Sequence, residues 1–118
     1  KHLEKSRGSF LSLDFRALGE PVYDEDRDVD ILFLEKDGYT VELVCPRSDA
    51  SVVAGLMKTH RNAPYHLCLE TDDLDGELKR LEASGFMRME EPAPALGGRR
   101  VCYLMSPWMG MVELLERG

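Results

Sequence analysis

Alternation of apolar and polar residues predicts strands in several stretches of the chain. EPVYDED at residues 20–26 predicts a short strand that ends in a polar turn, and VDILFLEKDGYTVELVCP at 29–46 predicts a hairpin. Within this hairpin, Asp37-Gly38 offers the positive φ angles that a tight turn requires. YHLCLET at 65–71 and FMRMEEP at 86–92 predict single strands. After a loop at 93–100, VCYLMSPWMGMVELLE at 101–116 predicts a second hairpin.

Helical spacing of apolar residues predicts three helices between these strands. Leu3, Phe10 and Leu11 mark a first helix that ends before Phe15. SDASVVAGLMKTH at residues 48–60 predicts a linking helix capped by Ser48 or Asp49 and ended by residues 61–64. The strongest pattern is DDLDGELKRLEASG at 72–85, with Asp72 or Asp73 as the cap, leucines at 74, 78 and 81, and Gly85 as the stop.

The second half of the chain repeats the plan of the first half. A constant shift of 71 positions pairs Leu3 with Leu74, Phe15 with Phe86 and Glu42 with Glu113. We therefore expect one domain over residues 1–118, with module one at 1–46, a linker at 47–63 and module two at 64–118. The same shift places the counterpart of His66 ahead of Lys1, so the first strand of module one is expected to be missing from this chain.

Composition narrows the class of partner. The chain has 118 residues, of which 43% are hydrophobic, and this suits one compact domain. A formal net charge of −7 without a basic patch argues against nucleic acid and anionic membranes, so small molecules are the expected partners. No apolar run is long enough to span a membrane, and the first residues lack a signal-peptide core. Three cysteines in apolar runs, without C-x-x-C spacing, predict buried thiols in a cytoplasmic protein.

A carboxylate stands in the same apolar setting twice, as Glu42 in TVELV and Glu113 in MVELLE. An unpaired carboxylate inside a strand is costly. Alternation along the strands places Glu42 on one face with Thr40 and Val44, and His66 on one face with Cys68. Leu67 and Leu69 then point to the other face, where they can pack on the leucines of the following helix.

One imidazole and two carboxylates form a nitrogen and oxygen donor set that suits one divalent ion, either Zn, Ni, Co, Fe or Mn. Each residue also has a simpler interpretation. Glu42 or Glu113 alone is typical of an exposed strand residue, His66 of a structural histidine and Cys68 of a small buried hydrophobe. Neither His2 nor His60 is expected to be a ligand.

The order of elements, together with PYHLCLETDDLDGELKRLEASGF, EEPAPALGGRRVCYLMSPWMGMVELLE and GYTVELVCP, resembles the vicinal-oxygen-chelate superfamily over nearly the whole chain. Within it, the sequence looks most like glyoxalase I and methylmalonyl-CoA epimerase. The resemblance implies an α+β fold in which paired βαβββ modules form an eight-stranded cup, in a protein that forms homodimers. It also implies Glu42, His66 and Glu113 as metal ligands, whereas the fourth family ligand, a histidine before the first helix, has no counterpart here.

The resemblance implies a divalent-metal-dependent isomerase or lyase that transfers a proton next to a carbonyl. By position, Glu113 resembles the catalytic base and Glu42 its partner. The epimerases also use an acid from the second strand of module one, for which Asp24, Glu25 and Asp26 are open candidates. The alternative for this acidic run is a solvated turn.

Substrate-binding residues are expected at the mouth of the cup. There Arg99 or Arg100 could bind a carboxylate or phosphate, and Trp108 could cover the metal. The alternative is that the arginines are surface charges and that Trp108 packs within its hairpin. The substrate itself is not encoded in any motif.

Three other functions are alternatives to the isomerase or lyase. An iron dioxygenase of the same superfamily uses two histidines and one carboxylate, so Glu42 counts against it. A metal-free binding protein of the bleomycin-resistance type typically lacks the metal ligands. The presence of Glu42, His66 and Glu113 in this chain therefore counts against it. A structural or regulatory domain with a relic site is the third alternative.

Overall fold

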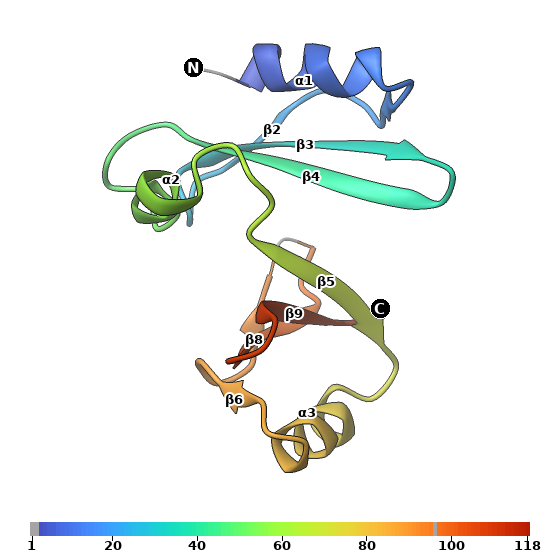
Figure 1. The fold of residues 1–118 in the computed structure, drawn as a ribbon, viewed down its shortest axis with the longest axis vertical. Coiled ribbons are helices and arrows are strands. Elements are labelled where there is room, and N and C mark those ends of the chain that lie inside the picture. The colour runs from blue at the N-terminus through green and yellow to red at the C-terminus, as the bar shows by residue number, and fades with distance from the viewer. Residues whose placement is uncertain (1–2, 96) are drawn as a thin grey trace. The chain divides into compact units, whose positions relative to one another are not determined.

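The computed structural model describes residues 3–95 and 97–118 (Figure 1). The chain divides into two compact units, of which the first ends at Asn62 and the second begins at Ala63. Each unit has its own sheet and its own helices, and each is described by itself. His2, which was not expected to be a ligand, lies outside the described residues.

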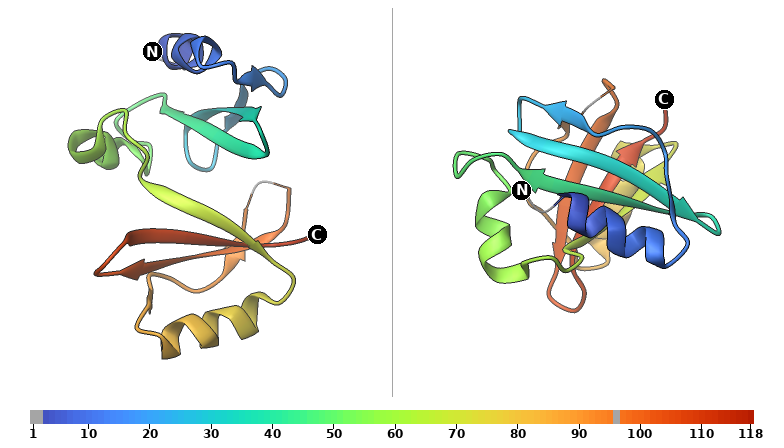
Figure 2. Two further views of the ribbon diagram at one scale, coloured as in Figure 1. Left: turned by 45° about the vertical axis from the view of Figure 1, so that its right-hand side comes forward. Right: turned by 90° about the horizontal axis from the view of Figure 1, so that it is seen from above.

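The first unit is built around one antiparallel sheet. It contains α1 (Leu3–Ser12), β1 (Arg16–Ala17), β2 (Val22–Asp24), β3 (Val29–Lys36), β4 (Tyr39–Pro46) and α2 (Ala54–His60). Strand β3 pairs with β4 along its whole length, and with β1 and β2 on its other side. Helix α1 lies over one face of this sheet (Figures 1 and 2). The predicted first hairpin is confirmed, with positive φ angles of 52° at Asp37 and 84° at Gly38.

The buried residues of the first unit come from its central strand. Val29, Ile31, Leu32 and Leu34 of β3 are buried. Helix α1 has no buried residue, and Leu11 of its predicted apolar stripe is exposed. Phe10 makes an edge-to-face contact with Phe15, with 5.3 Å between the ring centroids. Helix α1 is therefore held at its end and not along a continuous apolar stripe.

The predicted cap of α2 is wrong. The helix begins at Ala54, its N-cap is Val53, and no side chain caps it. Ser48 instead hydrogen-bonds to the Asp28 carboxylate and accepts from the Ala50 N–H. These groups stabilise the turns between β4 and α2, so they cannot also start a helix at residue 48.

The second unit contains a mixed sheet and one long helix. Its elements are β5 (His66–Thr71), α3 (Leu74–Ala83), β6 (Met87–Arg88), β7 (Ala93–Pro94), β8 (Arg100–Ser106) and β9 (Gly110–Glu116). The strand order is β5-β9-β8-β6, and β7 also pairs with β8. Strands β5 and β9 run parallel and the other pairs are antiparallel. The strand predicted at 86–92 is shorter than expected, and Ala93–Pro94, expected in a loop, pairs with β8.

Helix α3 covers one face of this sheet and closes its core. The Asp73 carboxylate accepts a hydrogen bond from the Gly76 N–H at 3.0 Å, which confirms one of the two predicted caps. The helix buries Leu74 and Leu78 completely. The buried cluster consists of these two leucines with Cys102, Leu104, Val112 and Leu114.

Some residues expected in the core are exposed. Leu67 and Leu69 keep more than half of their surface accessible, because β5 lies at the edge of the sheet. Of the three thiols, Cys102 is buried, Cys45 is half-buried and Cys68 is exposed, so the expected burial of Cys68 is wrong. Burial raises the pKa of the Cys102 thiol.

The two units repeat each other with one local slip. Helices α1 and α3 differ by 71 positions at both ends, as do β1 and β6. In the hairpins, however, Glu42 pairs with Phe33 and Glu113 pairs with Tyr103, so β3 and β8 are related by 70 positions. The second hairpin loop, residues 107–109, is one residue longer than Asp37-Gly38 and accounts for the slip.

The predicted α+β class and the repeated order of helix and three antiparallel strands are confirmed, with the edge strand of each module divided into two short segments. In the second unit β5 completes the βαβββ order. The union of the two sheets in one cup stays a prediction. Among the described residues, no helix is both long enough and apolar enough to cross a membrane.

Candidate functional site

Glu113 is a buried carboxylate in the middle of β9. Its residue surface is only 8% exposed, although a carboxylate is costly to bury without partners. Val112 and Leu114 on either side belong to the core cluster beneath α3. Because side chains alternate along a strand, Glu113 points to the sheet face away from that helix. The strand therefore fixes the Glu113 side chain on the sheet face that points away from α3.

His66 meets this carboxylate from the neighbouring strand. It is the first residue of β5, where the parallel register pairs it with Met111, two residues before Glu113 on the same face of β9. The His66 Nε2 atom lies 2.9 Å from Oε1 of Glu113. Both side chains are only about a tenth exposed. The sequence-predicted pair of His66 and Glu113 is thus brought into direct contact.

Two tyrosines surround the imidazole. The ring centroid of Tyr65 lies 4.5 Å and that of Tyr103 5.5 Å from the His66 ring, both in edge-to-face arrangements. Tyr103 is also the cross-strand partner of Glu113. Neither tyrosine is among the site residues predicted from the sequence, although the register of the second hairpin places Tyr103 opposite Glu113. These rings limit rotation of the imidazole and restrict water around it.

The His66 Nδ1 atom is buried and has no hydrogen-bond partner, alone in this respect among the buried side-chain nitrogen and oxygen atoms of residues 3–95 and 97–118. A buried polar atom without a partner is costly. The imidazole therefore has one nitrogen in contact with Glu113 and one that is unsatisfied, and a buried polar atom of this kind calls for an explanation, a bound ligand among them.

Glu42 occupies the equivalent position in the first unit with a different exposure. It lies on β4 opposite Phe33, as Glu113 lies opposite Tyr103, so each module pairs its glutamate with an aromatic ring. Glu42 is exposed, whereas Glu113 is buried. The two acids therefore share a strand position but not an environment.

The acidic run after β2 forms a turn. Asp24 is buried, and its Oδ1 accepts hydrogen bonds from the backbone N–H groups of Asp26 and Arg27 at 3.0 and 3.3 Å. Glu25 and Asp26 are exposed. Asp24 thus stabilises its own turn, while the other two acids lie at the surface.

The residues expected to bind substrate differ in their ion pairs and in their exposure. The Arg100 guanidinium donates to both Glu116 carboxylate oxygens at 2.9 and 3.0 Å and to Asp75 at 3.3 Å, and these acids raise its pKa. Arg100 in turn lowers the pKa of Glu116. Arg99 lies 3.6 Å from the Glu70 carboxylate. Trp108 is 93% exposed at the tip of the second hairpin.

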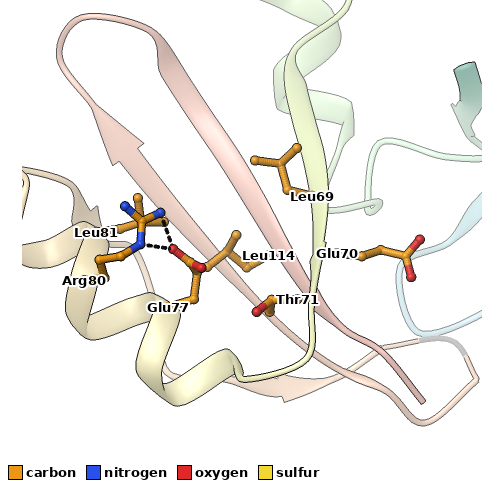
Figure 3. Close-up of a pocket in the computed structure, with 7 residues that line it drawn as sticks. All are labelled: Leu69, Glu70, Thr71, Glu77, Arg80, Leu81 and Leu114. Atoms are coloured by element: carbon orange, nitrogen blue, oxygen red, sulfur yellow. Dashed lines mark hydrogen bonds and ion pairs between the residues drawn. The ribbon is translucent and has the colours of Figure 1, made fainter.

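A separate hollow of about 140 Å³ lies between β5 and α3, on the helix side of the sheet (Figure 3). Of its three charged lining residues, Glu77 and Arg80 pair with each other, as Figure 3 shows, and the third is Glu70. The wall also includes Leu81 and Leu114. Neither His66 nor Glu113 lines it. This hollow is therefore not part of the candidate site.

A family model described as the Glyoxalase/Bleomycin resistance protein/Dioxygenase superfamily matches residues 1–103. The chain belongs to this superfamily. A mitochondrial methylmalonyl-CoA epimerase of Dictyostelium discoideum is 28% identical over 98% of this chain and 72% of its own length. An ethylmalonyl-CoA/methylmalonyl-CoA epimerase of Cereibacter sphaeroides is 27% identical over 86% of this chain and 78% of its own length.

Solved structures of other proteins share the fold. A hypothetical protein from Bacillus halodurans superposes with a TM-score of 0.86 at 22% identity, covering 98% of this chain and 86% of its own. Methylmalonyl-CoA epimerase from Mycobacterium tuberculosis gives a TM-score of 0.79 at 18% identity, covering 98% and 81% of the two chains. These likenesses confirm the glyoxalase-type fold predicted from the sequence.

The superfamily implies a divalent metal ion, and His66 and Glu113 have the donor chemistry for one. Imidazole nitrogens and carboxylate oxygens are common ligands of divalent ions in proteins. His66 Nε2 and Glu113 Oε1 lie 2.9 Å apart and face each other, so the two side chains could bind the same ion. Within the described residues, no group of three or more His, Cys, Asp or Glu side chains gathers in a ligating arrangement. The pair thus supplies two donors, and any further ligand is a matter of proposal.

Proposed function

We propose that this chain is a metal-dependent epimerase of a 2-alkylmalonyl thioester, of the methylmalonyl-CoA epimerase type. The observation that carries the proposal is the buried contact between His66 Nε2 and Glu113 Oε1 on one sheet face. The epimerase relatives, each below 30% identity, support the choice of thioester over other carbonyl substrates of the superfamily.

In the proposed reaction, the carboxylate of Glu113 removes a proton from the substrate. This proton is on the carbon between the substrate's own carboxylate and its thioester carbonyl. The carbon–hydrogen bond breaks, its electron pair moves into the carbonyl, and the proton goes to a Glu113 oxygen. A proton is then returned to the opposite face of the same carbon, which inverts its configuration. We assign this second acid to Glu42, the repeat counterpart of Glu113, with Glu25 and Asp26 as exposed alternatives.

The surroundings of Glu113 suit the role of base. Strand β9 fixes its backbone, His66 Nε2 lies 2.9 Å from one of its oxygens, and Tyr103 lies opposite. Burial keeps bulk water from competing for the proton. A divalent ion held by His66, Glu113 and Glu42 would, when bound, supply positive charge that favours loss of the substrate proton.

Deuterium exchange tests the reaction directly. Methylmalonyl-CoA is incubated in D2O with the full chain and a divalent ion, and exchange at the central carbon is followed by mass spectrometry. We expect exchange that stops on chelation and that falls at least about 100-fold in Glu113→Gln. Glu82→Gln, on the helix side of the sheet, is the matched control and keeps the wild-type rate. Absence of exchange with every divalent ion contradicts the proposal.

Metal content tests the ligand set without relying on activity. The chain is purified without chelator or nickel resin and analysed by plasma mass spectrometry. We expect about one ion per chain, lost in His66→Ala, Glu113→Ala and Glu42→Ala. An ion retained in Glu42→Ala removes Glu42 from the ligand set. No ion in the wild type after reconstitution favours a metal-free binding protein instead.

A further inference from the structure

Three methionines stand in line with His66 across the sheet of the second unit. Met87 of β6 pairs with Met105 of β8, Met105 pairs with Met111 of β9, and Met111 pairs with His66 of β5. Residues paired across neighbouring strands project their side chains from the same face. The methionine row, defined as Met87, Met105 and Met111, therefore leads across the sheet directly to the imidazole of the candidate site.

The row of Glu113 also has a methionine near its outer end. Glu113 pairs with Cys68 on one side and with Tyr103 on the other, and the Met89 N–H donates to the Tyr103 carbonyl at 2.9 Å. The chain contains six methionines, and only Met57 lies outside the second unit. Five of the six methionines thus lie in the unit that contains His66 and Glu113.

The methionine row runs from the surface to the partly buried end beside His66, and none of its members belongs to the buried core. Met87 is 68% exposed and Met105 is 38% exposed, whereas Met111 is half-buried. The opposite face of the same strands carries the buried cluster under α3, which includes Cys102 and Leu104. Core packing therefore does not account for these thioethers, since methionine is usually among the buried residues.

Methionine side chains are flexible, polarizable and able to repack around ligands of different shape. Surfaces that accept several partners use them for this reason. Neighbouring strands are about 4.8 Å apart, so Met111 lies about one strand spacing from His66 and Met105 about two. A chain of several methylene groups that begins at the reacting carbon can span this distance.

We propose that Met111 and Met105 bind the alkyl group on the reacting carbon of the substrate and make the site tolerant of alkyl chains longer than ethyl. This inference rests on the proposed function and specifies its substrate range. In this proposal, the alkyl group of the substrate lies against the sheet face at Met111 and Met105. A site lined by rigid branched side chains would instead select one length.

The test compares methylmalonyl-CoA with n-butylmalonyl-CoA in the deuterium exchange assay. For the wild type we expect kcat/KM values for the two thioesters within about tenfold of each other. Met105→Gln keeps the length of the side chain but makes it polar, so it should lower the butyl-to-methyl ratio about 5- to 20-fold. It should change exchange of methylmalonyl-CoA less than about threefold, because the methyl group does not reach Met105.

Two controls separate binding from folding. Met105→Leu keeps an apolar side chain and should retain most of the wild-type ratio, and Met57→Gln in α2 should leave the ratio unchanged. A thermal melt of each variant shows that it is folded. An unchanged ratio in folded Met105→Gln, or a wild type that exchanges methylmalonyl-CoA and rejects the butyl thioester by more than about 1,000-fold, overturns the inference. If the wild type exchanges neither thioester, the proposed function fails and the inference fails with it.

Discussion

His66 and Glu113 form a buried polar pair that the sequence predicts only in part. Each side chain is about one-tenth exposed, His66 Nε2 lies 2.9 Å from Glu113 Oε1, and Nδ1 of His66 has no hydrogen-bond partner among the described residues. The sequence could predict the strand, the face and the residue types, because alternation and the repeated VEL motif carry that information. It could not predict that Glu113 is buried and Glu42 exposed, because identical local sequences do not record what covers them.

Glu113→Gln should separate stability from function. The amide keeps the shape of the side chain and can still hydrogen-bond to His66, and it removes a buried charge, so the free energy of unfolding without metal should stay equal or rise by up to about 2 kcal/mol. Activity should be lost. Urea denaturation of the metal-free proteins measures the first effect. A loss of more than about 1 kcal/mol would show that Glu113 serves mainly to hold the fold.

The Arg100–Glu116 pair predicts a pH effect. Arg100 lowers the pKa of Glu116, so Arg100→Gln should raise that pKa toward its ordinary value near 4.5. The pair stabilises the folded state above the pKa of Glu116 in the unfolded chain, and this contribution is lost as the pH falls through the lowered folded pKa. Carboxyl carbon NMR during an acid titration measures the change. An unaltered pKa would show that the pair is not maintained in solution.

At the scale of the elements, the prediction succeeded where pattern and capping chemistry agreed. Helix α3 has both a leucine stripe and an aspartate cap, and it forms as predicted. Helix α2 starts later because Ser48 bonds to Asp28, a residue 20 positions away that no local pattern reveals. The same limit applies to Leu67, whose strand is paired on one side only by β9.

The cap of α3 gives a stability prediction. Asp73→Ala removes the acceptor of the Gly76 N–H and should lower the free energy of unfolding by about 1 kcal/mol. Asp72→Ala is the control, because the Asp72 carboxylate makes an exposed ion pair with Arg117, and its loss should cost less than about 0.5 kcal/mol. Chemical denaturation of both variants measures the difference. Equal losses would assign the effect to charge and not to the cap.

At the scale of the whole molecule, the internal repeat explains why a constant shift of 71 positions predicts most elements. It also explains why the shift fails along β8. A constant shift of 71 located both helices and both glutamates, since these elements kept their lengths. It failed along β8, because the longer second loop moves that strand by one position relative to β9. The sequence alone could not show this, because apolar residues fill both registers.

Each unit has its own buried residues, so a core substitution should act mainly within its unit. Leu78→Ala should cost about 2–5 kcal/mol and accelerate hydrogen exchange at Val112 and Leu114 of β9 more than at Ile31 and Leu32 of β3. Exchange followed by mass spectrometry or NMR measures both sets of amides. Equal acceleration in the two units would show that they unfold together.

The position of Trp108 gives the protein a built-in optical reporter. It is the single tryptophan of the chain and is almost fully exposed at the tip of the second hairpin. Its emission in the folded protein should therefore already resemble that of the indole in water, and unfolding should change it little. Any blue shift on addition of a thioester would instead record a ligand settling over the hairpin tip, so binding can be titrated by fluorescence without a label while folding is followed by circular dichroism.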